Sequence, residues 1–502
     1  MDLENFKKTI AEGYNFSTDY ITIGGAMFNN TPIKDLFINI PLKTLNRHGL
    51  IAGATGTGKT KTIQVLSEQL SNKGIPVLMM DIKGDFSGIA KQGTNNSFIE
   101  ERHAKMNLPF EPQGFPVELL TISKQNGVRL RATISEFGPV LLSRILNLND
   151  TQSGVMSLIF KYCDDHKLPL LDLKDLKKVI QYITNEGKDE IEKEYGRVST
   201  ASTGAILRKL IELEQQDADL FFGETSFDIK DLMRIDENGK AYVNILRLND
   251  IQDKPKLFST FMLCLLAEIY NTMPEQGDSG QPELVIFIDE AHLIFKEATK
   301  TLLDQIETIV KLIRSKGIGV FFITQNPTDI PDGVLAQLGL KIQHALRAFT
   351  DKDRKAIKLA SENFPSTPYY KTNEIITQIG TGEALVTALN EKGIPTPLAV
   401  CMIQAPMSRM DVLTPTEIDE LIAKSGLTNK YNQVVDRESA YELLNKKLTE
   451  TNSVENSTTK PTKSTSTKNT GESQVTKQLI KVLTSATFIR GAFGVLSKIF
   501  KK

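Results

Sequence analysis

The residues with the clearest chemical potential stand at positions 53–60 and read Gly-Ala-Thr-Gly-Thr-Gly-Lys-Thr. They match the pattern G-x-x-x-x-G-K-[ST] at every specified position. Glycines let a backbone curl tightly, so that successive N–H groups can surround a phosphate together with the positive end of a following helix. We expect Lys59 to reach the β and γ phosphates of a nucleotide and Thr60 to offer its hydroxyl to Mg²⁺. The predicted nucleotide-binding residues here are Gly53, Ala54, Thr55, Gly56, Thr57, Gly58, Lys59, Thr60 and Thr62.

The flanking sequence supplies the elements that this motif needs. An apolar run at 49–52, Gly-Leu-Ile-Ala, predicts a buried parallel strand, and residues 61–71 carry apolar residues at helical spacing. Strand, loop and helix in this order are the usual setting of a phosphate-binding loop. The alternative is a turn rich in glycine and threonine that fits the pattern by chance.

A second informative stretch, residues 283–292, reads Glu-Leu-Val-Ile-Phe-Ile-Asp-Glu-Ala-His. Its apolar residues predict a buried strand that delivers Asp289 and Glu290 to its carboxyl end. Asp289 suits Mg²⁺ binding, and Glu290 suits polarisation of the water that attacks a γ phosphate. Alone, the pattern would also fit a strand that runs into a helix, because acidic residues are favoured at helix N-termini. Beside a phosphate-binding loop, we favour the catalytic interpretation.

Another buried strand is predicted at 76–81, where it ends in Asp81 and is followed by Lys83 and Asp85. At the carboxyl end of a parallel strand these side chains face the ligand crevice, which makes them candidates for an accessory position near the nucleotide. A turn with a helix N-cap in the sequence Asp-Phe-Ser-Gly at 85–88 explains them equally well.

Residues 317–326 predict a further buried strand, which delivers Gln325 to its end. An amide both donates and accepts hydrogen bonds, so Gln325 could sense the γ phosphate or orient the attacking water. Arg314 precedes this strand, and Arg347 lies near the end of the next one, predicted at 341–348. Either arginine could stabilise phosphoryl charge across a subunit boundary, although a surface salt bridge is the common role of an isolated arginine.

The composition is that of an ordinary globular protein. The chain has 502 residues, of which 40% are hydrophobic and 24% are charged, and this length is too great for one simple core. The formal net charge of −1 lacks the overall basic character of many nucleic-acid-binding proteins. Any contact with DNA must therefore come from local patches of basic residues on the surface.

Cysteine usage and hydropathy indicate a cytoplasmic protein. Cys163, Cys264 and Cys401 are far apart in the sequence, which predicts buried thiols in a reducing compartment and argues against a zinc site. Residues 1–11 lack the features of a signal peptide, and the longest uncharged apolar run, 257–267, is too short to span a membrane. We expect no integral membrane segment.

We expect an α/β fold with a mostly parallel sheet flanked by helices, a largely helical insertion and a short N-terminal β cap. Strands are predicted at 20–23 and 36–40 in the cap, and at 117–122 and 128–133 ahead of the helical patterns of the insertion. The expected parts are the β cap (1–45), a first part of the ATPase core (46–93), the insertion (94–239), a second part of the core (240–405), a helical segment (406–449), a flexible linker (450–475) and a basic amphipathic helix (476–502).

The last two parts differ in composition. Residues 450–473 are rich in Thr, Ser, Lys and Asn, which predicts a flexible linker. Beyond them, apolar residues recur at spacings of three and four between Val482 and Phe500, and the charged residues are all basic. We favour an amphipathic helix that docks on the protein itself or on a partner subunit; contact with a membrane surface or with nucleic acid is the alternative.

Taken together, the motifs resemble the HerA-like branch of the HerA/FtsK ATPases and, more closely, bacterial YjgR-like proteins. The likeness covers most of residues 20–405. It is carried by residues 47–60, by Asp-Ile-Lys-Gly-Asp at 81–85, by Ile-Asp-Glu-Ala-His at 288–292, by Arg-Ser-Lys-Gly-Ile-Gly at 314–319 and by Thr-Gln-Asn-Pro at 324–327.

This resemblance implies a RecA-like core with ATP bound between the subunits of a ring, usually a hexamer. It favours Arg314 over Arg347 as the residue that reaches a neighbouring site, with Arg47 as a second candidate. The other roles it implies are phosphate and Mg²⁺ binding (Lys59, Thr60, Asp289), base catalysis (Glu290) and γ-phosphate sensing (Gln325).

We therefore expect a Mg-dependent ATPase of the HerA-like type that forms a homo-oligomeric ring and acts on DNA as a helicase or translocase. The alternative is an ATP-switched assembly or interaction module, in which the nucleotide state controls partner binding without DNA translocation. The near-neutral charge favours the alternative, and the resemblance favours the motor.

Overall fold

The computed structural model describes residues 3–455, apart from 278, 297–299, 349 and 436. The basic amphipathic helix predicted at 476–502 and the predicted linker from residue 456 onward lie outside the described residues. Two compact units are present. The first contains residues 3–129, 228–258 and 265–432, and the second contains residues 130–227, residues 259–264 and the described chain from 433 onward.

The described residues of the first unit contain a 12-stranded sheet with the order β2-β1-β12-β11-β10-β3-β9-β8-β4-β7-β5-β6. From β10 to β6 neighbouring strands run parallel, while β11, β12, β1 and β2 continue the sheet in antiparallel pairs. This arrangement confirms the predicted α/β class with a mostly parallel sheet. The strands are β1 Tyr20–Phe28, β2 Thr31–Pro41, β3 Gly49–Ala52, β4 Val77–Asp81, β5 Val117–Thr121, β6 Val128–Arg129, β7 Val243–Arg247, β8 Leu284–Ile288, β9 Ile318–Thr324, β10 Leu340–Gln343, β11 Glu383–Thr387 and β12 Ala399–Ile403.

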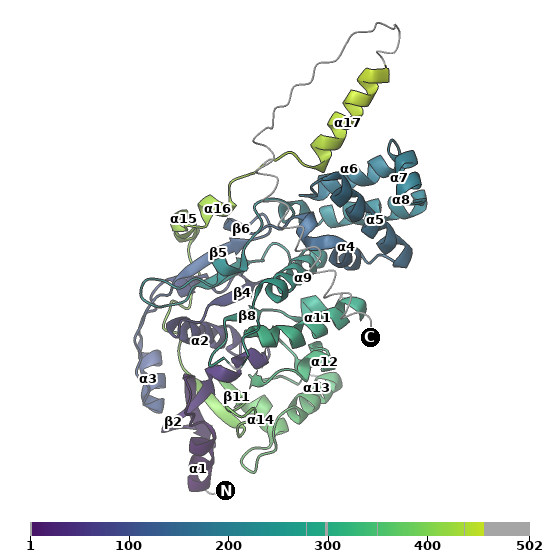
Figure 1. Cartoon of the computed structure of the whole chain (residues 1–502). Coiled ribbons are helices and arrows are strands. Elements are labelled where there is room, and N and C mark those ends of the chain that lie inside the picture. Colours follow the sequence, from purple (N-terminus) through teal and green to yellow (C-terminus); the bar gives the residue numbers. More distant parts are fainter. Residues whose placement is uncertain (1–2, 278, 297–299, 349, 436, 456–502) are drawn as a thin grey trace. The chain divides into compact units, whose positions relative to one another are not determined.

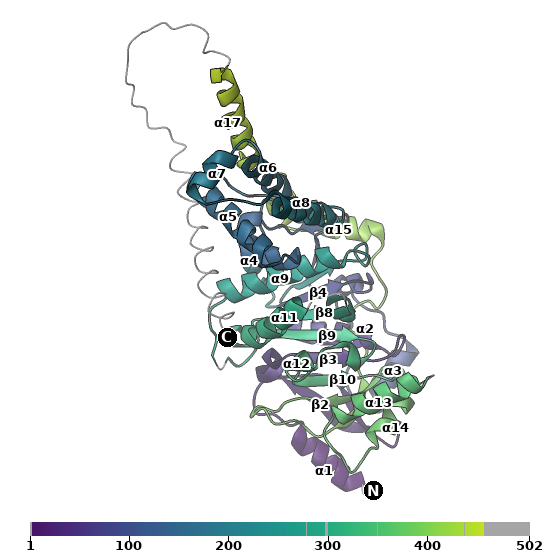
Figure 2. The same cartoon turned by 90° about the vertical axis from the view of Figure 1, so that its right-hand side faces the viewer.

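The central strands are continuous apolar runs. Every residue of β4, β8 and β9 is buried, as expected for parallel strands that are covered on both faces. Figure 2 shows β4, β8, β9, β3 and β10 side by side. The apolar runs predicted all five strands, but β10 ends at Gln343 instead of continuing to 348. Beyond this end, the N–H of His344 donates to the carbonyl of Ala52 (2.7 Å) and the carbonyl of Ala345 accepts the N–H of Ala54 (2.8 Å).

The two strands predicted at 117–122 and 128–133 belong to this main sheet. β5 pairs in parallel with β7, and β6 pairs in parallel with β5. β6 is only two residues long, so the second strand is shorter than predicted. Residues from Leu130 onward belong to the second unit.

The residues that precede β3 form the antiparallel edge of the sheet. β1 pairs with both β2 and β12. A helix that the sequence analysis did not anticipate, α1 (Leu3–Gly13), comes before β1. The Tyr14 hydroxyl donates to the carbonyls of Val386 (3.0 Å) and Pro397 (2.7 Å), and this contact ties the start of the chain to the strands that follow the site.

Helices connect the strands of the first unit. The apolar periodicity at 61–71 predicted α2, and the helical segment predicted at 406–449 contains α15 and α16, whereas the short helices α10, α12 and α14 show no such period. No helix in the described ranges is both long and apolar enough to cross a membrane. The helices are α2 Lys59–Asn72, α3 Ser97–Met106, α9 Pro255–Thr272, α10 His292–Lys296, α11 Lys300–Ile313, α12 Asp332–Leu335, α13 Asp351–Glu362, α14 Thr372–Gln378, α15 Pro415–Lys424 and α16 Thr428–Tyr431; residues 259–264 of α9 are grouped with the second unit.

The second unit is helical, and Figure 1 shows α4 to α8 grouped together. Side chains of Thr133, Asn149 and Asp172 begin three of its helices with capping boxes, which satisfy the free N–H groups of the first turn. Helix α17 packs against α6 and includes residues 450–455, the predicted start of the linker. The helices are α4 Ile134–Ile145, α5 Asp150–His166, α6 Leu173–Thr184, α7 Lys188–Glu194, α8 Thr200–Glu214 and α17 Ala440–Glu455.

A buried histidine joins α11 to the sheet just before β3. The Nδ1 of His48 accepts the N–H of Val320 (3.0 Å), so its Nε2 carries the proton and donates to the carbonyl of Val310 (2.8 Å). This arrangement requires the neutral ring. Burial lowers the pKa of His48 to about 4 from an ordinary value of 6.5, against the smaller opposing effect of the Val310 carbonyl.

We predict that His48 makes the fold sensitive to acid. A histidine with a lowered pKa contributes stability that is complete above 6.5 and is lost as the pH falls through about 4, and this shift corresponds to about 3 kcal/mol. Urea unfolding across this pH range measures it. His48→Asn keeps an acceptor near Val320 but cannot take up a proton, so it should be less stable at neutral pH and show a shallower pH dependence. Identical pH slopes for the two proteins would contradict the prediction.

Candidate nucleotide-binding site

The predicted phosphate-binding loop lies where β3 ends and α2 begins. Gly53, Gly56 and Gly58 have φ values of 155°, 77° and 112°, a region that favours glycine. A Cβ on Gly53 would lie 2.5 Å from the Cβ of His344, and one on Gly58 would lie 3.0 Å from the backbone of Gly382. Backbone conformation and close packing therefore both require these two glycines.

Lys59 lies over the loop. Its Nζ donates to the carbonyls of Gly53 (2.6 Å) and Ala54 (3.1 Å). Burial and the nearby charge of Lys83 lower the pKa of the Lys59 ammonium. The carboxylates of Glu290 and Asp289 act in the opposite direction, but the net effect is a lowered pKa. Thr60 is half-buried in the first turn of α2. A desolvated cation at a helix N-terminus is an arrangement that suits a phosphate group.

The two acidic residues follow β8 at the same edge of the sheet. Ile288 of β8 lies beside Met80 of β4, so the N–H of Asp289 approaches the Met80 carbonyl at 3.4 Å. Asp289 is buried, and burial raises the pKa of its carboxyl to about 7. Glu290 has a φ of 46°, and its N–H donates to Oδ1 of Asp289 at 2.9 Å. The structure thus brings Asp289 and Glu290 to the edge that carries the loop.

Gln325 connects the loop with Glu290. The Thr55 hydroxyl donates to Oε1 of Gln325 at 3.5 Å, and Nε2 of Gln325 donates to Oε1 of Glu290 at 3.4 Å. The Lys83 ammonium pairs with the same Oε1 atom. An amide between a phosphate-binding loop and a carboxylate is well placed to orient a water molecule.

Asp81 stabilises the turn that follows β4. Its carboxylate accepts the N–H groups of Gly84 (2.7 Å), Asp85 (3.0 Å) and Phe86 (3.3 Å). Burial raises the pKa of Asp81 to about 6, although these N–H groups act against the rise. The turn interpretation therefore accounts for Asp81, while Lys83 pairs with Glu290 across the site.

The donor set fits Mg²⁺ bound together with a nucleotide. Within the described residues, no group of three or more His, Cys, Asp or Glu side chains could hold a metal ion on its own. Mg²⁺ is typically held by one or two protein oxygens together with phosphate oxygens and water. The buried Asp289 carboxylate and the Thr60 hydroxyl are the residues that would hold it here, and the bound ion would neutralise phosphate charge.

Thr62 and His344 lie behind the loop. The Nδ1 of His344 donates to the Glu383 carbonyl (2.9 Å), so its Nε2 accepts the Thr62 hydroxyl (3.0 Å). Thr62 is 1% exposed, and its hydroxyl is used in this contact with the protein. Burial lowers the pKa of His344 to about 4. The sequence analysis did not single out His344. The signal that identified Gln325, a polar residue directly after a buried parallel strand, also applies to His344, which follows β10.

Arg102 braces the loop from α3. Its Nε donates to the Ile403 carbonyl (2.7 Å) and its Nη2 to the Gly382 carbonyl (2.5 Å). The N–H of Gly382 in turn donates to the carbonyl of Thr57 in the loop (2.9 Å). No local pattern in the sequence pointed to Arg102, because its partners stand about 300 residues further along the chain.

The three predicted arginines lie at different edges of the sheet. Arg47 precedes β3 and Arg314 precedes β9, so both stand at the amino ends of parallel strands, opposite the edge that carries the loop. Arg347 follows β10 on the loop edge and is exposed. Arg47 and Arg314 therefore lie away from the chain's own loop, and their role at the nucleotide of another subunit stays a prediction.

The family of the chain follows from comparison with known proteins. Residues 28–491 match the family described as the helicase HerA-like C-terminal domain. The chain belongs to this family. The predicted HerA-like assignment is therefore confirmed, whereas the narrower YjgR-like likeness stays a prediction.

Curated relatives with DNA-related names support this assignment. The DNA double-strand break repair helicase HerA of Sulfolobus acidocaldarius is 24% identical over 404 residues, which cover 79% of this chain and 72% of that protein. HerA of Sulfurisphaera tokodaii is 25% identical, with coverages of 70% and 64%. The DNA import protein CedB of Sulfolobus acidocaldarius is 24% identical, with coverages of 76% and 57%. The chain thus spans between about half and three quarters of these relatives.

Solved structures support the fold. The bacterial conjugative coupling protein TrwB, lacking its first 70 residues, matches in its unbound monoclinic form with a TM-score of 0.50 and 14% identity, over 81% of this chain and 94% of that chain. Its trigonal form with sulphate matches with a TM-score of 0.51 and 13% identity, over 81% and 95%. At this identity the likeness shows the fold alone.

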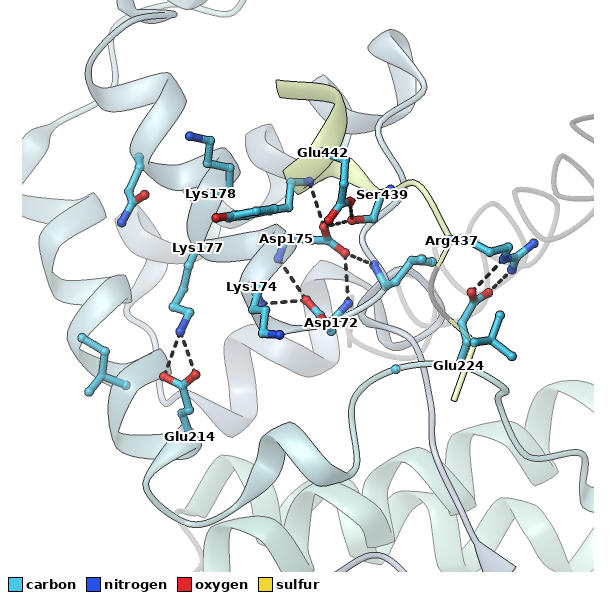
Figure 3. Close-up of a pocket in the computed structure, with 16 residues that line it drawn as sticks. Asp172, Lys174, Asp175, Lys177, Lys178, Glu214, Glu224, Arg437, Ser439 and Glu442 are labelled. Carbon is cyan, nitrogen blue, oxygen red and sulfur yellow. Dashed lines mark hydrogen bonds and ion pairs between the residues drawn. The ribbon is translucent and has the colours of Figure 1, made fainter. Parts of the chain in front are cut away.

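A separate pocket of about 810 Å³ lies within the second unit (Figure 3). Several of its charged groups have partners within the protein: Lys177 pairs with Glu214 at 2.7 Å, and Asp175 accepts the backbone N–H of Tyr441 at 2.9 Å. None of the residues predicted for the nucleotide site lines it. The ion pair joins α6 to α8 and the hydrogen bond joins α6 to the start of α17, which indicates a structural role.

We predict that removal of the Arg102 brace weakens nucleotide binding. Arg102→Met leaves the carbonyl of Gly382 without its charged donor, so the Thr57 backbone is held less firmly, and we expect the Kd for Mg-ATP to rise about tenfold, equivalent to roughly 1.4 kcal/mol. Fluorescence titration with a labelled nucleotide measures this change. Lys105→Met on the same helix, which removes an exposed pair with Glu101, is the control and should bind like the wild type. Equal affinities for all three proteins would contradict the prediction.

Proposed function

We propose that this chain is a Mg-dependent ATPase that converts ATP to ADP and phosphate. The observation that carries the proposal is the convergence of Lys59, Asp289, Glu290 and Gln325 from three strand ends at one edge of the sheet. A phosphate-binding loop, a buried carboxylate for the metal and a second carboxylate for water are the parts that phosphoryl transfer to water requires.

In the proposed reaction each residue has a separate task. The loop N–H groups and Lys59 bind the β and γ phosphates, and they stabilise the charge that develops on the transferring phosphoryl group. Gln325 orients the attacking water, and the Glu290 carboxylate accepts its proton. The low exposure of Glu290 and Lys59, 6% and 7%, strengthens these electrostatic interactions because bulk water is excluded.

We propose further that the subunits form a ring, such as a hexamer, in which Arg314 or Arg47 reaches the nucleotide of a neighbour. Both arginines lie on the edge opposite the chain's own loop, which supports a role in trans. The ring would move DNA, or move on it, as a helicase or translocase. This part of the proposal is supported by the HerA relatives, whose names describe DNA repair helicases.

A second candidate function is an ATP-switched assembly module that does not translocate DNA. The formal net charge of −1 favours it, since a protein that tracks along a polyanion commonly carries a basic surface. In this case the nucleotide state would control assembly or partner binding through the helical insertion and the carboxyl-terminal tail.

We predict that Lys59→Ala and Glu290→Gln separate binding from hydrolysis. Lys59→Ala removes the cation of the loop, so nucleotide binding should be lost. Glu290→Gln keeps the shape of the side chain but is a far weaker base, so it should bind Mg-ATP and hydrolyse it at least about 100-fold more slowly. Phosphate release and nucleotide titration measure the two effects, and chelation of Mg²⁺ should stop turnover of the wild type. Equal turnover in wild type and Glu290→Gln would remove Glu290 as the base.

We predict that DNA stimulates hydrolysis if the chain is a motor. Turnover should rise several-fold with single- or double-stranded DNA, and the apparent affinity for DNA should fall steeply as salt increases, because phosphate contacts release counterions. The experiment is an ATPase assay across a salt series, on protein sized by light scattering. Glu290→Gln in the same assay is the control for contaminating activity. Unchanged turnover together with a nucleotide-dependent change in assembly size would favour the assembly module over the motor.

A further inference from the structure

The ion pair between Lys83 and Glu290 lies at the centre of the site. The Lys83 ammonium contacts Oε1 of Glu290, the atom that also accepts from Gln325. The other oxygen, Oε2, is buried, lies 3.1 Å from Nδ1 of His292 and has no partner with hydrogen-bond geometry. In this state one oxygen of the carboxylate is therefore occupied and the other is directed away from solvent.

This pairing is unfavourable for a general base. The Lys83 ammonium and the Gln325 amide both contact Oε1 of Glu290, so the lone pairs of this oxygen are already engaged. A carboxylate stabilised in its charged form by a cation accepts a proton less readily. A productive complex therefore needs the ammonium to leave Oε1.

Lys83 is able to move, although the turn that carries it is fixed. The turn is held by Asp81, which accepts three backbone N–H groups. The side chain of Lys83 is 35% exposed, whereas that of Glu290 is 8% exposed. The flexible four-carbon stem of a lysine can thus swing from a rigid turn, while the carboxylate stays in place.

The positive charges beside the loop suggest the alternative partner of Lys83. Lys59 and Lys83 lie near one another and near the carboxylates of Asp289 and Glu290, so two cations and two anions share this region of the site. A triphosphate held by Lys59 adds its γ phosphate to this region, and a phosphate is a strong competitor for an ammonium.

We propose that Lys83 is a nucleotide-sensing positioning residue: Glu290 and the γ phosphate compete for its ammonium, so that a bound triphosphate frees the carboxylate to act on water. This inference rests on the proposed function. Without a γ phosphate, in the empty site or with ADP, Lys83 stays on Glu290 and the base stays engaged. The arrangement ties the availability of the base to the presence of a cleavable substrate.

Binding measurements on single and double variants test this competition without relying on turnover. The ligands are Mg-ADP and a non-hydrolysable Mg-ATP analogue with an imido bridge. Glu290→Gln frees Lys83, so it should bind the analogue at least about fivefold more tightly than the wild type does and bind ADP within about twofold of it. Lys83→Met should bind the analogue about tenfold more weakly, equivalent to one lost charged contact. In the Lys83→Met background, Glu290→Gln should have no further effect on the analogue.

Two further variants serve as controls. Lys83→Arg keeps the charge and should preserve the preference for the triphosphate. Lys91→Met removes an exposed lysine of the same connecting segment and should bind both ligands as the wild type does. The proposal is overturned if Glu290→Gln changes ADP and analogue binding equally, or if its effect persists without Lys83. Failure of the wild type to bind either nucleotide would instead refute the proposed function itself.

Discussion

The parallel register of β3, β9, β8 and β4 is the constraint on which the rest of the structure depends. Ala52 lies beside Thr324, Phe322 beside Ile288, and Ile288 beside Met80. Because the strands run in the same direction, the residues after them emerge at one edge of the sheet. The loop, Gln325, the acidic pair and the Lys83 turn thereby meet, although more than 200 residues separate the loop from the acidic pair in the sequence.

A set of polar contacts behind the loop fixes its shape. Arg102 and Gly382 hold the Thr57 carbonyl from one direction, and His344 occupies the space beside Gly53. These groups come from α3 and from the chain between β10 and β11. The loop can therefore present its N–H groups without rearrangement, and such preorganisation is the main source of electrostatic stabilisation in catalysis of this kind.

Charge in the site is balanced inside a poorly solvated region. Burial makes the charged form of Asp289 and of Lys59 less favourable, as their shifted pKa values indicate. Mg²⁺ and a triphosphate would supply opposite charge to both groups. The pair between Lys83 and Glu290 fills part of this role in the protein alone.

The sequence alone determined the local elements and the chemical groups. Apolar runs located the central strands, and the loop motif, Asp289, Glu290 and Gln325 were identified because each follows such a run directly. Tertiary structure decided the rest. The Lys83 partner, the Arg102 brace and the contact of Thr62 with His344 join residues that are between about 200 and 300 positions apart, and no local periodicity encodes them. The end of β10 and the pairing of β5 and β6 likewise depended on neighbouring strands, because hydrogen bonds between strands, and not the residue pattern of one strand, set where a sheet begins and ends.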